Sequence, residues 1–263
     1  MGHMTSLADQ TIDALRNLHN ELAALVPTLT DEQLTGPSGA SEWTVAQVLS
    51  HLGSGSEIGL TSYRTAMDGT PEPGPDFNQS VWDRWNAMNP QDQAAAFLEH
   101  DETLVSTIES LTPDQRESLQ IKLGFLPQPL DVATIAGMRL NEVALHGWDV
   151  SVGVDPVATL NEIAADVLVK QFSGSLGFLL GFTAKADVLA EPTIVDAGGF
   201  GLVIEDAVRL VPSADSATAT FDGPPEAFIR LMGGRLTETY TPDAVSVVGN
   251  VSLEDLRRVF PGF

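Results

Sequence analysis

The chain has 263 residues, enough for one large domain or two ordinary ones, and its 43% hydrophobic and 19% charged residues are typical of a folded globular protein. Its 13 Lys and Arg against 36 Asp and Glu give a net charge of −23, so we expect neither nucleic acid nor an anionic membrane as a partner. The absence of cysteine excludes disulfides, cysteine metal sites and a protein-borne thiol nucleophile.

The beginning of the sequence and its apolar runs bear on location. Gly2-His3-Met4 resembles an expression scar, so we leave residues 1–3 out of the fold and expect the native chain to begin at Met4. No signal-peptide pattern follows, and no apolar run approaches the roughly 20 residues that a membrane-spanning helix needs. The expected location is therefore the cytoplasm.

The first part of the chain has the periodicity of helices. Apolar residues recur at three- and four-residue steps between residues 7 and 25, which predicts an amphipathic helix, followed by a turn at residues 30–32. A second helix is expected to begin at Thr44, a residue type that caps helix N-termini well. Trp43, just before this cap, is interpreted as a core anchor of that helix.

Two further helical segments complete this part. A third helical region contains residues 82–108, and a fourth helix is predicted over residues 131–150, with Trp148 as its core anchor. Between them, residues 125–129 are expected to be extended, because residues before proline avoid the helical conformation. Four such helices predict a bundle, a fold whose core commonly houses metal sites built from facing helices.

The pattern changes after Gly153. A long helix is predicted over residues 161–182, and Gly198 and Gly199 predict a hairpin turn between the first two of several short strands. The expected strands and the remaining helices are 193–195, 201–204, 208–211 and 218–221, a helix at 225–232, a strand at 245–248 and a helix at 253–259. The sequence thus predicts a multi-domain protein, with an α domain over residues 4–153 and a small α+β domain over residues 154–263.

Three residues of the helical part form a candidate metal site. Glu142 and His146 are four residues apart on one predicted helix, which places both side chains on the same face. His51 lies beside the apolar stripe of the second helix, where an unpaired imidazole would be costly. Together they give three ligands and leave a further coordination position open, as in catalytic zinc sites.

Spacing alone leaves an alternative, since a Glu–His pair at this separation also occurs on helix surfaces. Arg139 and Asp149 flank the pair by about one turn each and are candidates to orient the ligands. His19 and His100 are interpreted as surface or boundary residues and not as ligands.

The two segments that carry these residues resemble a known family. SEWTVAQVLSHL at residues 41–52 resembles the second-helix motif of DinB-like metalloproteins. RLNEVALHGWD at 139–149 resembles the fourth-helix motif of their mycothiol-dependent maleylpyruvate isomerase branch. The resemblance implies a DinB-like four-helix bundle followed by a sterol-carrier-like α+β domain, with zinc bound by His51, Glu142 and His146.

The resemblance also implies an arginine in the second domain. The end of a helix is enough to account for Gly233 and Gly234. The position of Arg235, directly after them, resembles that of an essential arginine in the second domain of that branch. It is the candidate catalytic residue, expected to hold a substrate carboxylate or the thiol cofactor across a domain cleft, with Arg230 as the alternate and Arg84 as a third option.

The implied activity uses an external thiol. The resemblance names mycothiol, the low-molecular-weight thiol of actinobacteria, which zinc would activate as a thiolate for S-transfer to a small electrophile or for a maleylpyruvate-type cis–trans isomerisation. The alternatives are a non-catalytic protein with a structural metal that binds a thiol conjugate or hydrophobic ligand, and a hydrolase that uses zinc-bound water. A His₂Glu ligand set also accepts nickel, iron or manganese.

Overall fold

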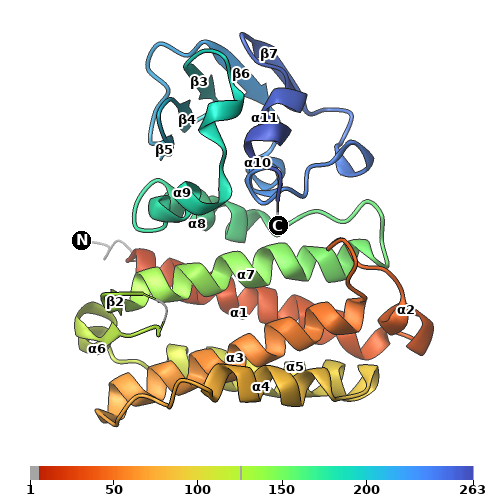
Figure 1. Cartoon of the computed structure of the whole chain (residues 1–263), viewed down its shortest axis with the longest axis vertical. Coiled ribbons are helices and arrows are strands. Elements are labelled where there is room, and N and C mark those ends of the chain that lie inside the picture. Colours follow the sequence, from red (N-terminus) through yellow and green to blue (C-terminus); the bar gives the residue numbers. More distant parts are fainter. Residues whose placement is uncertain (1–5, 125, 263) are drawn as a thin grey trace, which may run out of the picture. The chain divides into compact units, whose positions relative to one another are not determined.

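The computed structural model describes residues 6–124 and 126–262 of the chain. These form two compact units that meet in sequence between Ala158 and Thr159. The first unit is helical apart from one small hairpin, and the second combines helices with a sheet (Figure 1). This is the predicted fold class. Some predictions include residues that lie outside the described ones: the predicted expression scar at residues 1–3, Phe125 of the predicted extended segment, and Phe263 at the end of the predicted second domain.

Four long helices build the first unit: α1 (Leu7–Leu25), α3 (Val45–Asp68), α5 (Pro90–Glu109) and α7 (Val132–Val152). Helix α1 packs against α5 and α7, and α3 packs against the same two helices, so the four form the predicted bundle (Figure 1). Their buried faces are mostly aliphatic, and Trp148 is a core residue as predicted, with its indole N–H donating to the Ala158 carbonyl at 2.8 Å.

Local capping determines where these helices begin. The Thr44 side chain accepts a hydrogen bond from the Gln47 backbone N–H, and the Gln47 side chain accepts one from the Thr44 N–H, which confirms the predicted start of α3. Asp131 caps α7 in the same position through the Thr134 N–H. The helix that carries Glu142 and His146 therefore begins and runs as its sequence predicts.

The smaller elements of the first unit include one correction. The segment predicted as a turn at 30–32 begins a short helix, because Thr30 and Gln33 form a capping box there as well. This helix is α2 (Asp31–Thr35), and the other short elements of the first unit are η1 (Val26–Thr28), α4 (Phe77–Asn86), α6 (Pro113–Ser118), β1 (Gln120–Ile121) and β2 (Leu130–Asp131). Strands β1 and β2 pair antiparallel and had no counterpart in the sequence prediction.

A five-stranded sheet forms the centre of the second unit, in the order β5-β4-β3-β6-β7. Its strands are β3 (Thr193–Asp196), β4 (Gly201–Ile204), β5 (Val208–Val211), β6 (Ala219–Asp222) and β7 (Ser246–Gly249). Neighbouring strands are antiparallel except for β3 and β6, which are parallel. Gly198 and Gly199 make the predicted hairpin turn with positive φ of 73° and 128°.

The helices of the second unit are α8 (Glu162–Phe172), α9 (Leu180–Thr183), α10 (Pro225–Met232) and α11 (Leu253–Val259), together with η2 (Gly177–Leu179), η3 (Ala186–Val188) and η4 (Glu238–Tyr240). The ring of Phe228 on α10 meets Phe200 and Phe221 edge-on at centroid distances of 5.0 and 5.2 Å, which joins α10 to the sheet. Helices α10 and α11 have the predicted bounds.

The predicted helix over 161–182 is wrong in its middle. Helix α8 ends at Phe172, and the chain bends by 81° before the turns of η2 and α9. Ser173 and Gly174 are poor helix formers, and the bend buries Leu176 completely. Among the described residues no single helix has the length and apolar character to cross a membrane, and the bent pair Glu162–Phe172 and Gly177–Thr183 passes that test only when taken together.

Candidate metal centre

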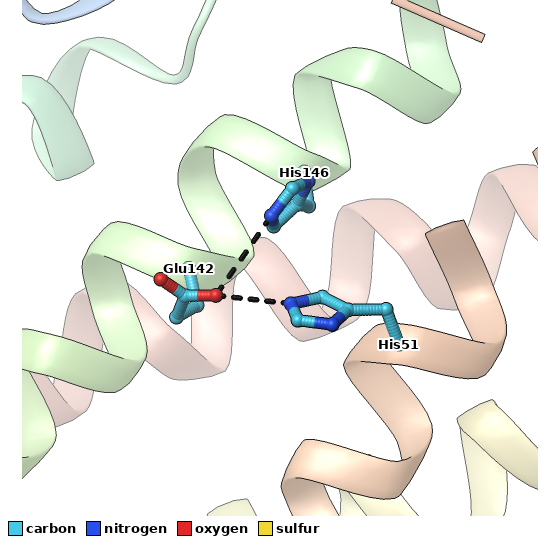
Figure 2. Close-up of side chains that lie close together, drawn as sticks. All are labelled: His51, Glu142 and His146. Atoms are coloured by element: carbon cyan, nitrogen blue, oxygen red, sulfur yellow. Dashed lines mark hydrogen bonds and ion pairs between the residues drawn. The ribbon is translucent and has the colours of Figure 1, made fainter. Parts of the chain in front are cut away.

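The bundle brings His51, Glu142 and His146 together, as Figure 2 shows. His51 extends from α3, and Glu142 and His146 extend from adjacent turns of α7. The ligand atoms of the three side chains all lie within 4.8 Å of one another. Glu142 Oε2 is 3.1 Å from His51 Nε2 and 3.8 Å from His146 Nε2. The predicted grouping of these residues is therefore present in the fold.

These separations suit a metal ion. Nitrogen and oxygen ligands lie about 2.1 Å from zinc, so two of them at a tetrahedral angle are about 3.4 Å apart. The two distances from Glu142 Oε2, 3.1 and 3.8 Å, lie on either side of that value. A divalent ion fits among the three groups with small side-chain adjustments, and three protein ligands leave coordination space for a further molecule.

Asp149 determines how His146 faces the cluster. Its carboxylate is completely buried, with Oδ2 2.9 Å from His146 Nδ1. Because an ionised carboxylate only accepts hydrogen bonds, Nδ1 carries the proton and Nε2 presents its lone pair towards Glu142 and His51. This is the carboxylate–histidine arrangement that orients metal-bound imidazoles, and Asp149 is in the orienting position that its spacing predicted.

The charge balance keeps Glu142 ionised. Desolvation of the carboxylate acts to raise its pKa, but the hydrogen bond from His51 and the electrostatic interactions with His146, His51 and Arg139 outweigh it, so the pKa is lowered. An ionised Glu142 is the form that binds a cation. The cluster thus combines a carboxylate with two imidazoles that face it.

Trp43 lies against this cluster and is not the core anchor that its sequence position predicted. Its side chain is 39% exposed, and its ring is stacked on His146 at a centroid distance of 6.1 Å and a 19° interplanar angle. The His51 ring is 5.4 Å away. Trp43 therefore forms a partly solvent-exposed aromatic wall beside both histidines.

The loop before α3 holds Trp43 in this place. Gly39 donates its backbone N–H to the Asp149 carbonyl at 2.8 Å, which fastens the loop to the end of α7. A Cβ at Gly39 would lie 2.9 Å from Asp149 Oδ1 and 2.7 Å from a methyl group of Val152, so only glycine allows this approach. Glu42, next to Trp43, has a positive φ of 67°, an uncommon backbone conformation for a residue with a side chain.

Two neighbouring residues have buried polar partners. His19, interpreted from the sequence as a surface or boundary residue, is in fact only 5% exposed, with Nδ1 2.8 Å from Asp101. Arg139, a candidate to orient the ligands, donates hydrogen bonds to the Leu52 carbonyl, Ser56 and Asp101. These contacts form a buried polar cluster one helical turn away from the metal ligands.

His100 and Arg84 lie in a different part of the bundle surface. His100 is partly exposed, as predicted, and its ring meets that of Trp85 edge-on at 5.2 Å. The guanidinium of Arg84 pairs with Glu57, whose other oxygen accepts from the Trp85 indole N–H at 2.9 Å. Arg84, the third option for a substrate-binding arginine, is thus engaged in an ion pair.

The two arginines of the second unit have different surroundings. Arg230 is 1% exposed; its Nε and NH2 donate to the Glu226 carboxylate at 2.8 and 2.9 Å, and NH1 donates to the Tyr240 carbonyl. Arg235 is partly exposed, follows Gly234 at φ 73°, and donates from NH1 to the Gly233 carbonyl at 2.7 Å. Burial therefore favours Arg235 over Arg230 as the arginine that meets a ligand.

Comparisons with known proteins fit this arrangement. Residues 15–151 match the model of a protein family described as the mycothiol maleylpyruvate isomerase N-terminal domain. The chain is similar to a crystal structure of the mycothiol-dependent maleylpyruvate isomerase, with a TM-score of 0.65 and 14% identity over 94% of this chain and 98% of the other. A histidine-to-alanine mutant of that isomerase matches equally, at 15% identity. No curated protein sequence matches the chain significantly.

Proposed function

The chain belongs to the mycothiol maleylpyruvate isomerase N-terminal domain family, and on this premise we propose that it is a metal-dependent enzyme that uses mycothiol. The observation that carries the proposal is the His51–Glu142–His146 cluster, which lies within the matched residues and has the spacing of a three-ligand metal site. Zinc is the proposed metal, since two imidazoles and one carboxylate form a common catalytic zinc set.

The proposed chemistry follows from the charge of the site. Zinc with two neutral imidazoles and one carboxylate keeps a net charge of about +1, which lowers the pKa of a coordinated thiol and supplies a thiolate at neutral pH. The chain has no cysteine of its own, so the nucleophilic sulfur has to be that of a small molecule. The similar crystal structure is that of an isomerase described as mycothiol-dependent, so mycothiol is the proposed thiol.

This chain's own residues have separate tasks in the proposed enzyme. His51, Glu142 and His146 would hold the metal, and Asp149 keeps the proton on His146 Nδ1 so that Nε2 is the nitrogen that faces the metal position. Arg235 is proposed to bind a carboxylate of the substrate or of the thiol, because a guanidinium recognises carboxylates in a bidentate manner. The exposed side chain of Trp43 shields the two histidines on one side.

Two reactions are compatible with this ligand set. An isomerase returns the thiol unchanged and converts a cis double bond into a trans one, whereas an S-transferase leaves a new carbon–sulfur bond in its product. Of the two we favour S-transfer to a small electrophile, because the family is broad and maleylpyruvate is a narrow substrate. The cytoplasm remains its predicted location.

The test loads the purified protein with zinc and incubates it with mycothiol plus maleylpyruvate, and separately with mycothiol plus a model electrophile. Isomerisation of the first or conjugation of the second, each dependent on both metal and thiol, supports the proposal. His51→Ala should abolish turnover and the bound zinc, whereas His100→Ala, a histidine outside the cluster, should retain both. A protein that binds zinc and thiol conjugates but turns over neither substrate would instead be a binding protein.

A further inference from the structure

A single buried carboxylate connects the helices of the bundle. Asp101 on α5 is 1% exposed, and its oxygens lie 2.8 Å from His19 Nδ1 on α1, 3.1 Å from Ser56 Oγ on α3 and 2.7 Å from Arg139 NH2 on α7. His19 Nε2 also lies 2.8 Å from Glu102. Asp101 therefore contacts one polar group from each of the other three long helices.

Arg139 connects the two helices that carry the metal ligands. It precedes Glu142 by three residues on α7, and its NH2 donates across to α3, to the Leu52 carbonyl at 3.1 Å and to Ser56 Oγ at 2.6 Å. Leu52 directly follows His51 in the chain. The contact is thus made within about one turn of the ligand on each helix.

Gly55 on α3 leaves room for the Arg139 guanidinium. A Cβ at Gly55 would lie 3.2 Å from Arg139 NH1, closer than ordinary contact. The guanidinium therefore lies close against the α3 backbone and is held from α5 by its ion pair with Asp101.

This arrangement is a poor way to stabilise a bundle. Arg139 Nε is buried with no hydrogen-bond partner among the residues that the structure describes, which costs free energy. A buried ion pair is also often no more stabilising than apolar residues of similar size. The apolar residues that fill the rest of the bundle would serve stability at least as well. The charged pair is better explained by the helix positions that it enforces.

We propose that Arg139, held by Asp101, is a positioning residue that sets the separation of α3 and α7 and with it the distance between His51 and Glu142. The inference rests on the proposed metal site but not on the proposed reaction.

The test measures metal binding by variants of the full chain. Arg139→Met keeps an unbranched side chain but removes the hydrogen bonds, Arg139→Lys keeps the charge, and Asp101→Asn weakens the hold on Arg139. Arg116→Met is the control, because Arg116 also joins elements of the bundle, but its hydrogen bonds run to Asp9 on α1 and to the Glu109 carbonyl on α5.

Cobalt(II) reports the site directly, through its visible spectrum and its affinity in competition with a chelator. We expect Arg139→Met to lower the affinity roughly 10- to 100-fold, the range seen when groups that support metal ligands are removed, and to shift the visible bands. Arg139→Lys should recover part of both, and Asp101→Asn should lie between Arg139→Met and the unmodified protein. Arg116→Met should lower the denaturation midpoint but leave the spectrum and the affinity unchanged.

The proposal is wrong if folded Arg139→Met binds cobalt with the spectrum and affinity of the unmodified protein. Where that variant does not fold, unchanged spectra in both Arg139→Lys and Asp101→Asn overturn it equally. A protein that binds cobalt normally but shows no mycothiol-dependent turnover would refute the proposed reaction alone, so the two failures are distinguishable.

Discussion

Asp149→Asn is the sharpest test of how the candidate metal centre is held. The buried Asp149 Oδ2 accepts from His146 Nδ1 at 2.9 Å, and the amide oxygen of asparagine can occupy the same place without the negative charge. The imidazole loses the electrostatic support that raises its basicity as a ligand. Removing such a supporting partner typically costs 10- to 100-fold in metal affinity, or about 1.4 to 2.7 kcal/mol.

The assay is zinc affinity by chelator competition at neutral pH, with the metal-free free energy of unfolding measured alongside. Asp13→Asn on the exposed face of α1 makes the same chemical change away from the cluster and should leave the affinity unchanged. If Asp149→Asn binds zinc within twofold of the unmodified protein, the metal affinity of His146 does not depend on the negative charge of Asp149, and the electrostatic support assigned to this carboxylate is wrong.

Three other outcomes follow from the packing of the first unit. Cobalt addition should quench the fluorescence of Trp43, whose ring lies 5.4 Å from that of His51, and Trp43→Phe should remove most of the quenching. In denaturant unfolding, Gly53→Ala should lower the free energy of unfolding by about 1–3 kcal/mol, since its Cβ would lie 2.2 Å from the buried Trp85 ring. Gly59→Ala is the control: its Cβ would make only ordinary contact with Leu104, so it should be neutral or stabilising by up to ~1 kcal/mol. Burial acts to raise the pKa of Asp101, but His19 and Arg139 outweigh it and lower the pKa below its ordinary value of 3.8. The ionised carboxylate therefore stabilises the fold fully above about pH 4, and this contribution is lost as the pH falls through the lowered pKa. The stability difference between the unmodified protein and Asp101→Asn should narrow in unfolding curves below pH 4, and a constant difference would contradict the ion pairing.

The sequence predicted the bounds of α1, α7, α10, α11 and the strands of the five-stranded sheet closely, because the deciding interactions there are local. Thr44 and Gln47 satisfy each other's backbone groups within one turn, and the glycines at 198 and 199 adopt the positive φ that their hairpin needs. Thr30 and Gln33 have the same capping-box spacing, so the short helix α2 was predictable from the sequence although a turn was predicted there. The bend after Phe172 depends on the burial of Leu176, a tertiary effect that periodicity does not register.

Two of the three candidate ligands were predictable from local geometry, and the third was not. Glu142 and His146 meet because of helix geometry alone, whereas His51 joins them from 91 residues away through the packing of α3 against α7. No local rule connects His51 to that pair, and its assignment depended on a resemblance between two motifs. The exposure of Trp43 was not predictable, since an aromatic residue before a helix cap serves equally well as a core anchor.

Asp101 was missed, although its sequence carried a signal. On α5 the buried residues Phe97, Leu104, Val105 and Ile108 recur at three- and four-residue steps, and Asp101 occupies the position between them on the same stripe. A carboxylate on an apolar stripe requires a buried partner. The chain has 36 acidic residues, and Asp101 differs from the solvent-exposed ones in its position on the helix and not in its chemistry. The partner that satisfies it, Arg139, lies three residues before a candidate metal ligand, so the same side chains that relieve a buried charge also fix where that ligand stands.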